Sequence, residues 1–302
     1  MSSTSADSQR SGILFAISAY TMWGVAPIYF KALTHIPAQE ILMHRVVWSV
    51  LVLLVLIIGL RHFRKVRDAL GSAKVLATLF CAGFLLAGNW LLFIWAVNHN
   101  FMLEASLGYF INPLINVFLG RVFLGEKLRP VQKLAVLIAM IGVGLLVFSY
   151  GHLPWIALTL ACSFGIYGLL RKQVNVDSMP GLFIETGMML PAAIIYWWFF
   201  ASVSSDMTLN SSSLNMLLLF AGVLTTAPLL CFTAAARRIK YSTLGMFQYI
   251  GPSIMFVLAI AVYGESLSQQ RLITFFLVWS ALAIYSYDSL HQRNKVRKAS
   301  KR

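Results

Sequence analysis

Long apolar runs limit the kind of structure that this chain can adopt. A helix needs about 20 apolar residues to cross the hydrocarbon core of a bilayer. The 302 residues contain ten such runs, at 12–33, 41–60, 75–97, 103–124, 131–149, 153–170, 181–200, 214–236, 243–262 and 271–288. Only 11% of the residues are charged, too few to cover a soluble protein of this length. The sequence therefore predicts an all-α integral membrane protein with ten transmembrane helices.

The basic residues are distributed unevenly over the connections between these runs. One alternate set of connections, which includes both tails, carries 20 of the 24 lysines and arginines: Arg10, Arg61, Arg64, Lys65, Arg67, Lys74, Lys127, Arg129, Lys133, Arg171, Lys172, Arg237, Arg238, Lys240, Arg293, Lys295, Arg297, Lys298, Lys301 and Arg302. Because cytoplasmic loops are enriched in lysine and arginine, both termini are predicted to be cytoplasmic. We expect the net charge of +14 to contact anionic lipid, and we expect no nucleic-acid partner.

The second half of the chain repeats features of the first at a shift of 139 residues. The tripeptide Ile-Asn-Pro at 111–113 corresponds to Ile-Gly-Pro at 250–252, and a Gly-Glu pair ending at Glu126 corresponds to one ending at Glu265. Convergent helix-end chemistry is the alternative explanation, since glycine is common at helix C-termini. We read the shared spacing as an internal repeat and the two glutamates as structural residues at helix ends.

The repeat predicts the topology. The predicted units are residues 1–150 (spans 12–149) and 151–302 (spans 153–288 and a basic tail). Five crossings per unit make the second enter the membrane from the opposite face, so the sequence predicts two inverted five-helix repeats. Inverted repeats around a midplane site are a recurring transporter design. Pro113 and Pro252 each remove a backbone hydrogen bond in mid-span, and we expect them to act as hinges.

Three segments resemble a known family. They are NWLLFIWAVN at 89–98, EASLGYFINP at 104–113 and FQYIGP at 247–252. Together they resemble the RarD branch of the EamA permeases, in the drug/metabolite transporter superfamily, over Gly12 to about Asp288. The resemblance implies ten helices, a bacterial inner-membrane location and transport of a solute, usually export.

Ionisable residues in the second span form the first candidate site, because such groups are costly inside a bilayer. Glu40 and His44 are four residues apart and share a helix face, with Arg45 beside it. The alternative is a snorkelling group or a local ion pair at the outer end of the span. The resemblance includes this Glu, His and Arg cluster, which favours a functional interpretation.

The fourth span carries a stripe of polar and small residues. Glu104, Gly108, Asn112, Asn116 and Gly120 recur every four residues and therefore follow one slowly turning face. Lipid would disfavour such a face, so it must either line a cavity or pack on another helix. A packing seam explains the glycines well and Glu104 less well, and we favour a cavity.

Several other residues complete the predicted solute site. They are Asn89 and Trp90 in the third span, Tyr109 beside the carbonyl freed by Pro113, and Gln248 and Tyr249 beside the one freed by Pro252. The aromatic residues Tyr20, Trp23 and Tyr167 are read as packing. Two interpretations of Glu185 stay open: a hydrated residue at a helix end, or a functional group.

Other chemistries have little support. The stretch 120–127 superficially resembles a phosphate-binding loop, but Glu126 stands where that motif needs lysine, and no loop has room for a nucleotide domain. We therefore expect no ATP dependence. Cys81, Cys162 and Cys231 all lie within spans and read as buried hydrophobes, so neither a metal nor another cofactor is expected.

The sequence hypothesis is a secondary transporter that moves a small organic solute, such as a metabolite, amino acid or drug, by alternating access. If transport is coupled to protons, Glu104 or Glu40 is the expected carrier. A zwitterion would place its carboxylate on Arg45 and its amine on a glutamate. The alternatives are a non-transporting membrane scaffold and an intramembrane enzyme, and the sequence shows no catalytic constellation for the latter.

Overall fold

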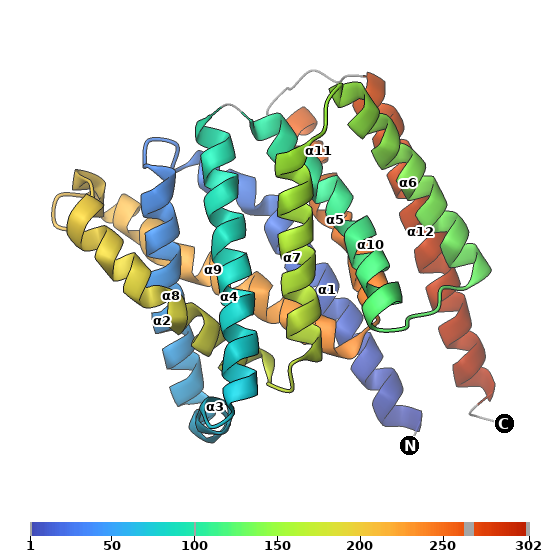
Figure 1. The fold of residues 1–302 in the computed structure, drawn as a ribbon, viewed down its shortest axis with the longest axis horizontal. Coiled ribbons are helices and arrows are strands. Elements are labelled where there is room, and N and C mark those ends of the chain that lie inside the picture. Colours follow the sequence, from blue (N-terminus) through green and yellow to red (C-terminus); the bar gives the residue numbers. More distant parts are fainter. Residues whose placement is uncertain (1, 100, 263–268, 300–302) are drawn as a thin grey trace.

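The computed structural model describes residues 2–99, 101–262 and 269–299, and the regular structure of these residues is entirely helical (Figure 1). The helices are α1 (Ser2–Lys31), α2 (Ala38–Gly59), α3 (Phe63–Leu70), α4 (Ala73–Asn98), α5 (Met102–Phe123), α6 (Pro130–Tyr150), α7 (Trp155–Gln173), α8 (Ser178–Phe200), α9 (Ser212–Arg238), α10 (Tyr241–Gln248), α11 (Ile250–Ala261) and α12 (Gln269–Ala299), with a short 3₁₀ helix η1 (Val203–Ser205).

Eight helical segments are long and apolar enough to cross a membrane. These segments lie in α1, α2, α4, α6, α8, α9, the run α10–α11, and α12. Among the described residues, α5 and α7 do not meet this criterion. Both pack between other helices, α5 against α7 and α10, and α7 against α4, α5 and α9. Their polar side chains can therefore meet protein instead of lipid, and the ten-span count stays a prediction.

The helix ends differ from the sequence prediction at three places. Helices α1 and α12 extend beyond their predicted spans, and the α12 extension is rich in lysine and arginine, which are good helix formers. Helix α3 lies in a segment that we predicted as a loop. It is amphipathic and buries Val66 and Ala69 against α2, α4 and α8, so packing fixes this short helix.

The predicted ninth span is broken in the middle. Helix α10 ends at Gln248 and α11 begins at Ile250, with Tyr249 as the junction. Pro252 has no N–H to donate to the Gln248 carbonyl, and its ring crowds that carbonyl, so the helix breaks one turn earlier. Pro113 lies inside α5, which continues past it.

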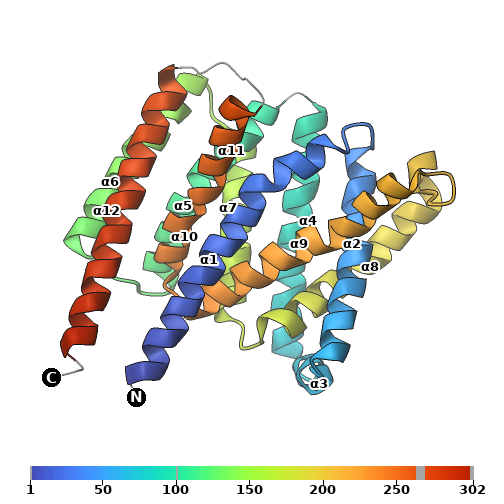
Figure 2. The ribbon, with the colours of Figure 1, turned by 180° about the vertical axis from the view of Figure 1, so that it is seen from behind.

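The helices form a slanted bundle in which neighbours in space are often distant in sequence. Helix α6 packs along α12 at one edge, and α2 packs on α8 at the other (Figure 1). Between these edges, α1 contacts α9 and α11, α4 contacts α7, and α5 contacts α7 and α10. Figure 2 shows α9 crossing the bundle obliquely. Both chain termini lie at the same end of the bundle, where α3 also lies (Figure 1).

At this end an acidic residue joins three elements. Asp177, just before α8, accepts hydrogen bonds from Lys65 on α3 (2.7 Å) and Arg237 on α9 (2.6 Å). These bonds lower the pKa of Asp177 to about 2. A carboxyl whose folded-state pKa is depressed stabilises the fold above its unfolded pKa of about 3.9, and loses this contribution as the pH falls through about 2.

We predict that Asp177→Asn lowers thermal stability at pH 7 by a few degrees. Each exposed ion pair contributes at most about 1 kcal/mol, and the Asp177 side chain is 45% exposed, so a larger effect is not expected. Melting curves in detergent at pH 7 and at the lowest tolerated pH measure the difference. Asp206→Asn is the control, because the Asp206 carboxylate bonds only to nearby residues of its own loop. An unchanged melting temperature for Asp177→Asn at pH 7 would contradict the prediction.

Candidate functional site

The first predicted residue, Glu40, anchors a loop. Its carboxylate accepts hydrogen bonds from the Ser202 N–H and the Ser204 hydroxyl, in the segment that follows α8. The side chain is 1% exposed. Glu40 therefore fastens the start of α2 to the loop before α9, and its carboxylate is not paired with Arg45.

His44 lies between α2 and α8. Its Nδ1 accepts a hydrogen bond from the Trp48 indole N–H (3.0 Å), and its ring meets the Trp197 ring edge to face at 5.1 Å. The imidazole is fully buried, and its Nε2 has no hydrogen-bond partner among the described residues. His44 thus faces a different neighbour from Arg45, although the two residues are adjacent in the chain.

Arg45 occupies a cage of aromatic side chains from other helices. Its Nε donates to the Thr225 hydroxyl on α9 (2.8 Å). Its guanidinium carbon lies 4.5 Å from the centre of the Trp90 ring on α4 and 5.7 Å from that of Phe30 on α1. A guanidinium over an aromatic face is attracted by the ring quadrupole. Within the described part of the chain, Arg45 has no carboxylate partner.

Tyr109 on α5 completes this group. It lies close enough to Arg45 for electrostatic interaction, and its ring packs against Phe93 at 6.2 Å. Tyr109 is 39% exposed and Phe30 is 36% exposed, so protein does not cover this group completely. We call Arg45, Phe30, Trp90, Tyr109 and Thr225 the Arg45 cage.

The stripe on α5 packs against its neighbours. The Asn112 amide donates to the Ala161 carbonyl of α7 (2.6 Å), and the Asn116 amide donates to Asn112 Oδ1 (3.1 Å) and to Gln248 Oε1 of α10 (2.9 Å). A Cβ on Gly108 would lie 3.1 Å from the Ala157 carbonyl oxygen. These residues match the packing-seam alternative, with amides that bond across helices.

Glu104 lies at the end of this seam that is opposite the chain termini. Its carboxylate accepts hydrogen bonds from the Ile156 N–H at the start of α7 (2.8 Å) and from the Tyr150 hydroxyl of α6 (3.0 Å). It is 1% exposed. A carboxylate at a helix N-terminus satisfies an otherwise free N–H and interacts favourably with the helix dipole. We therefore assign Glu104 to helix capping and do not carry it into the candidate solute site.

Glu126 performs the same task at another helix, as the sequence predicted. It accepts bonds from the Tyr241 N–H (2.6 Å) and from the N–H and hydroxyl of Ser242 (2.9 and 2.7 Å), at the start of α10. Its predicted counterpart Glu265 lies outside the described residues.

The remaining predicted residues also join helices. Asn89 of α4 donates to the Leu160 carbonyl and to the Ser163 hydroxyl of α7, both at 2.8 Å. The Tyr249 hydroxyl donates to the Phe110 carbonyl of α5 (3.2 Å). Of the eleven predicted contacts, Arg45, Trp90 and Tyr109 come together in the cage, whereas Asn112 and Gln248 meet through Asn116 in the packing seam. Neither hinge proline, Pro113 nor Pro252, is a member of the cage.

A second aromatic group fills the bundle nearer the termini. Tyr20 and Trp23 of α1, Phe164 and Tyr167 of α7, and Phe232 of α9 form a network with ring centroids 5.2–6.3 Å apart. We call these five residues the aromatic plug. Tyr20, Tyr167 and Phe232 are almost completely buried. The plug therefore closes the centre of the bundle on the side of the Arg45 cage that faces the termini.

Sequence reasoning missed three features of this region. Phe30 and Thr225 face Arg45 only because α1 and α9 pack beside α2, and no spacing in the chain reveals that. The sequence predicts Arg171 in a connection between spans, but it is 1% exposed and forms an ion pair with Glu185. Arg171 stands next to Lys172, and two adjacent basic residues after an apolar run are typical of a loop. Glu185 inside a span was the one feature of the sequence that indicated a buried charged group here.

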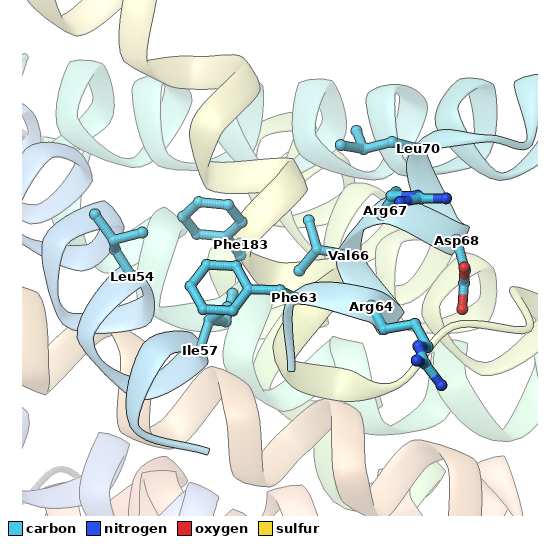
Figure 3. A pocket seen from close by; sticks show the side chains of 9 residues that line it. All are labelled: Leu54, Ile57, Phe63, Arg64, Val66, Arg67, Asp68, Leu70 and Phe183. Atoms are coloured by element: carbon cyan, nitrogen blue, oxygen red, sulfur yellow. The ribbon is translucent and has the colours of Figure 1, made fainter. Parts of the chain in front are cut away.

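Two cavities lie outside the cage. A small apolar crevice of about 80 Å³ lies between α2, α4 and α8, beside Trp90. A larger one of about 630 Å³ lies at α3, where Figure 3 shows Phe63, Phe183 and Ile57 on one side and Arg64, Arg67 and Asp68 on the other. Neither cavity is lined by Arg45.

Comparison with known proteins defines the class. The sequence profile of the EamA-like transporter family matches the chain twice, at residues 10–148 and 154–287. An uncharacterized transporter of Vibrio cholerae is 56% identical over 96% of each chain, and Protein RarD of Escherichia coli K12 is 49% identical over 96% of this chain and 98% of that protein. The chloramphenicol-sensitive protein RarD of Pseudomonas aeruginosa is 29% identical over 92% of this chain and 94% of that one.

The chain therefore belongs to the EamA-like transporter family, in its RarD branch. It is a bacterial membrane transporter of the drug/metabolite class. A solved crystal structure at 15% identity superposes with a TM-score of 0.73 and covers 94% of this chain and 99% of its own. That likeness supports the fold alone.

We predict that Glu104→Ala lowers the free energy of unfolding by about 1–3 kcal/mol, because it leaves the Ile156 N–H and the Tyr150 hydroxyl without their acceptor. Tyr150→Phe removes one of the two bonds and should cost less. Thermal unfolding in detergent measures both variants. A Glu104→Ala protein that is as stable as wild type, but fails to transport, would restore Glu104 to the solute site.

Proposed function

We propose that this chain is a secondary transporter of a small organic anion, which binds in the Arg45 cage and crosses by alternating access. The observation that carries the proposal is the state of Arg45. Thr225 binds only its Nε, and the faces of Trp90 and Phe30 hold the guanidinium without neutralising it. Arg45 is half-buried and has no counter-charge among the described residues, and an unpaired charge inside a membrane is costly, which favours a functional role for it. A planar guanidinium suits a carboxylate or another oxyanion.

The cage chemistry narrows the solute class. Glu40 and Glu104 are both occupied by other contacts, so neither offers a carboxylate to an amine beside Arg45. This disfavours the zwitterion that the sequence suggested. The surrounding rings of Trp90, Phe30 and Tyr109 favour an anion that also carries an apolar or aromatic part.

The arrangement of helices supports two related halves. The family profile matches once in each half. In order along the chain, α1, α2, α4, α5 and α6 of the first half correspond to α7, α8, α9, α10–α11 and α12 of the second. Contacts between helices follow this correspondence. The contact of α1 with α9 corresponds to that of α7 with α4, and the contact of α5 with α7 corresponds to that of α10–α11 with α1. We infer ten crossings in two inverted repeats.

The positions of cage and plug support an outward-facing state. The cage residues of α2 and α5 lie about two turns from the helix ends opposite the termini, and the plug lies nearer the termini. The distribution of basic residues favours cytoplasmic termini in an inner membrane. On this basis the plug closes the cytoplasmic side, and transport requires its opening.

We predict that Arg45→Gln reduces transport at least about tenfold, because the oxyanion loses its charged partner. Arg45→Lys should retain part of the activity, since lysine keeps the charge but not the planar fork. The measurement compares metabolites in medium and cytoplasm between cells that express wild type, each variant, or no copy. Arg129→Gln is the matched control, because Arg129 pairs with Asp288 at the bundle edge.

Thermal stability separates function from structure in this test. Removing a half-buried charge that has no counter-charge should leave the melting temperature of Arg45→Gln unchanged or raised. Wild-type redistribution of solutes by Arg45→Gln, or a transported solute that is a cation, would contradict the proposal. A protein that redistributes no solute at all would support the scaffold alternative.

A further inference from the structure

A buried ion pair lies beside the aromatic plug. Arg171 of α7 and Glu185 of α8 are 1% and 0% exposed, and Arg171 Nε lies 3.5 Å from Glu185 Oε1. Arg171 Nη2 donates to the Ser178 carbonyl at the start of α8 (3.1 Å). The Tyr167 side chain, a member of the plug, interacts with both charged groups. The pair is therefore connected directly to the residues that close the bundle.

Unpartnered polar atoms gather at this place. Both carboxylate oxygens of Glu185, Nε and Nη1 of Arg171, and the hydroxyls of Tyr167 and Tyr20 are buried, and none makes a hydrogen bond of good geometry within the described residues. An ionised carboxylate inside a protein is stable only when it is paired and also hydrogen-bonded. The Glu185 carboxylate has a partner at a loose distance and no hydrogen bond, which favours its accepting a proton.

The surroundings leave Glu185 as the one acid in this part of the described bundle. The titratable groups that face the pair are Tyr167 on α7 and, next to Tyr167, Tyr241 on α10, with Tyr20 on α1 beside Tyr241. The faces of α2, α4 and α9 that pack near this part of α8 are apolar, with Leu53, Ile57, Leu79, Ala82, Leu229, Phe232 and Ala236. The next charged groups are Asp177 with Lys65 and Arg237 at the start of α8, and Glu126 with Lys172 beyond Tyr241.

We propose that Glu185, held by Arg171 and adjoining Tyr167, is the proton-binding site that couples transport to a proton gradient. This inference rests on the transport function proposed above. The proton comes from water and adds to a Glu185 carboxylate oxygen, which neutralises the acid. Arg171 then keeps its charge without a partner, and a conformation that hydrates the guanidinium becomes favourable. Because Tyr167 belongs to the plug and interacts with both members of the pair, this conformation opens the plug.

The roles of the acids therefore differ from the sequence hypothesis. Glu40 and Glu104 were the expected proton carriers, and both are bound by backbone N–H groups and hydroxyls. Such donors stabilise the charged form of a carboxylate. Glu185 accepts no backbone N–H within the described residues, and the one hydroxyl beside it, that of Tyr167, makes no hydrogen bond of good geometry with it, which makes Glu185 the better carrier.

The first experiment measures proton binding without any solute. Infrared difference spectra of the purified protein in lipid nanodiscs, recorded while the pH is lowered from about 9 to about 5, should show a carbonyl band of a protonated carboxyl group. The band should vanish in Glu185→Gln and persist in Glu104→Gln. A pH-dependent band that survives in Glu185→Gln, or no band at all, would overturn the proposal. If Glu185→Gln does not fold, Tyr167→Phe should move the midpoint of the band to higher pH, and an unmoved midpoint overturns it equally.

The second experiment measures opening of the plug. Cys231 lies next to Phe232 and is partly buried against the core. With Cys81 and Cys162 replaced by serine, its labelling by a charged methanethiosulfonate should rise at least about fivefold between pH 8 and pH 5, normalised to a single cysteine introduced at Gly71, in the exposed loop between α3 and α4. The rise should be absent in Glu185→Gln. Labelling of Cys231 that ignores pH in the wild-type background would refute the coupling.

Neither measurement depends on the cage. If either measurement contradicts the role of Glu185, the transport test of Arg45 still stands. If the transport test fails, proton binding and plug opening can still be measured.

Discussion

Inside a membrane every polar group must find its partner within the protein, and this constraint organises the bundle. Lipid offers no hydrogen bonds, so an unsatisfied group there costs several kcal/mol. Helix α5 shows how the chain meets the requirement. Glu104 binds the start of α7, Asn112 binds an α7 carbonyl, and Asn116 binds Gln248 on α10. These bonds fix α5 between two helices of the other half.

Two groups in the bundle satisfy this requirement only in part. Arg45 has aromatic faces and one hydroxyl but no counter-charge. The Arg171–Glu185 pair has a counter-charge but few hydrogen bonds. The aromatic plug lies between the cage and the helix ends near the termini, and Tyr167 joins it to the ion pair. An anionic solute would neutralise Arg45, and a proton would neutralise Glu185. Each event would lower the free energy of a charged group that is incompletely paired, and this is the energetic basis of the alternating access proposed here.

Much of the fold was readable from sequence because it depends on local rules. Apolar runs predicted the long helices, and Glu126 was expected as a structural residue at a helix end. Pro252 was expected to act as a hinge, and the break before α11 lies one turn ahead of it. The site was harder. The four-residue spacing from Glu104 to Asn116 identified a polar face correctly, but spacing cannot say what packs on that face. Here α7 and α10 cover it.

The residues that sequence missed share a physical cause. Arg171 follows an apolar run and precedes Lys172, so it read as a cytoplasmic anchor, although the fold turns it inward against α8. Phe30 and Thr225 are ordinary span residues whose role comes only from the packing of α1 and α9 around Arg45. Three residues of the second span that were expected to form one cluster, Glu40, His44 and Arg45, each contact a different neighbour.

The central claim is that the Arg45 cage lines a space that water reaches from the side opposite the termini. The direct measurement is labelling of Tyr109→Cys, in a protein with its three native cysteines replaced, by a charged, membrane-impermeant thiol reagent added to oriented vesicles. The account predicts fast labelling from the outer face, and slow labelling of Asn112→Cys in the adjacent buried seam. An inert Tyr109→Cys, or equal reactivity of the two positions, would contradict it.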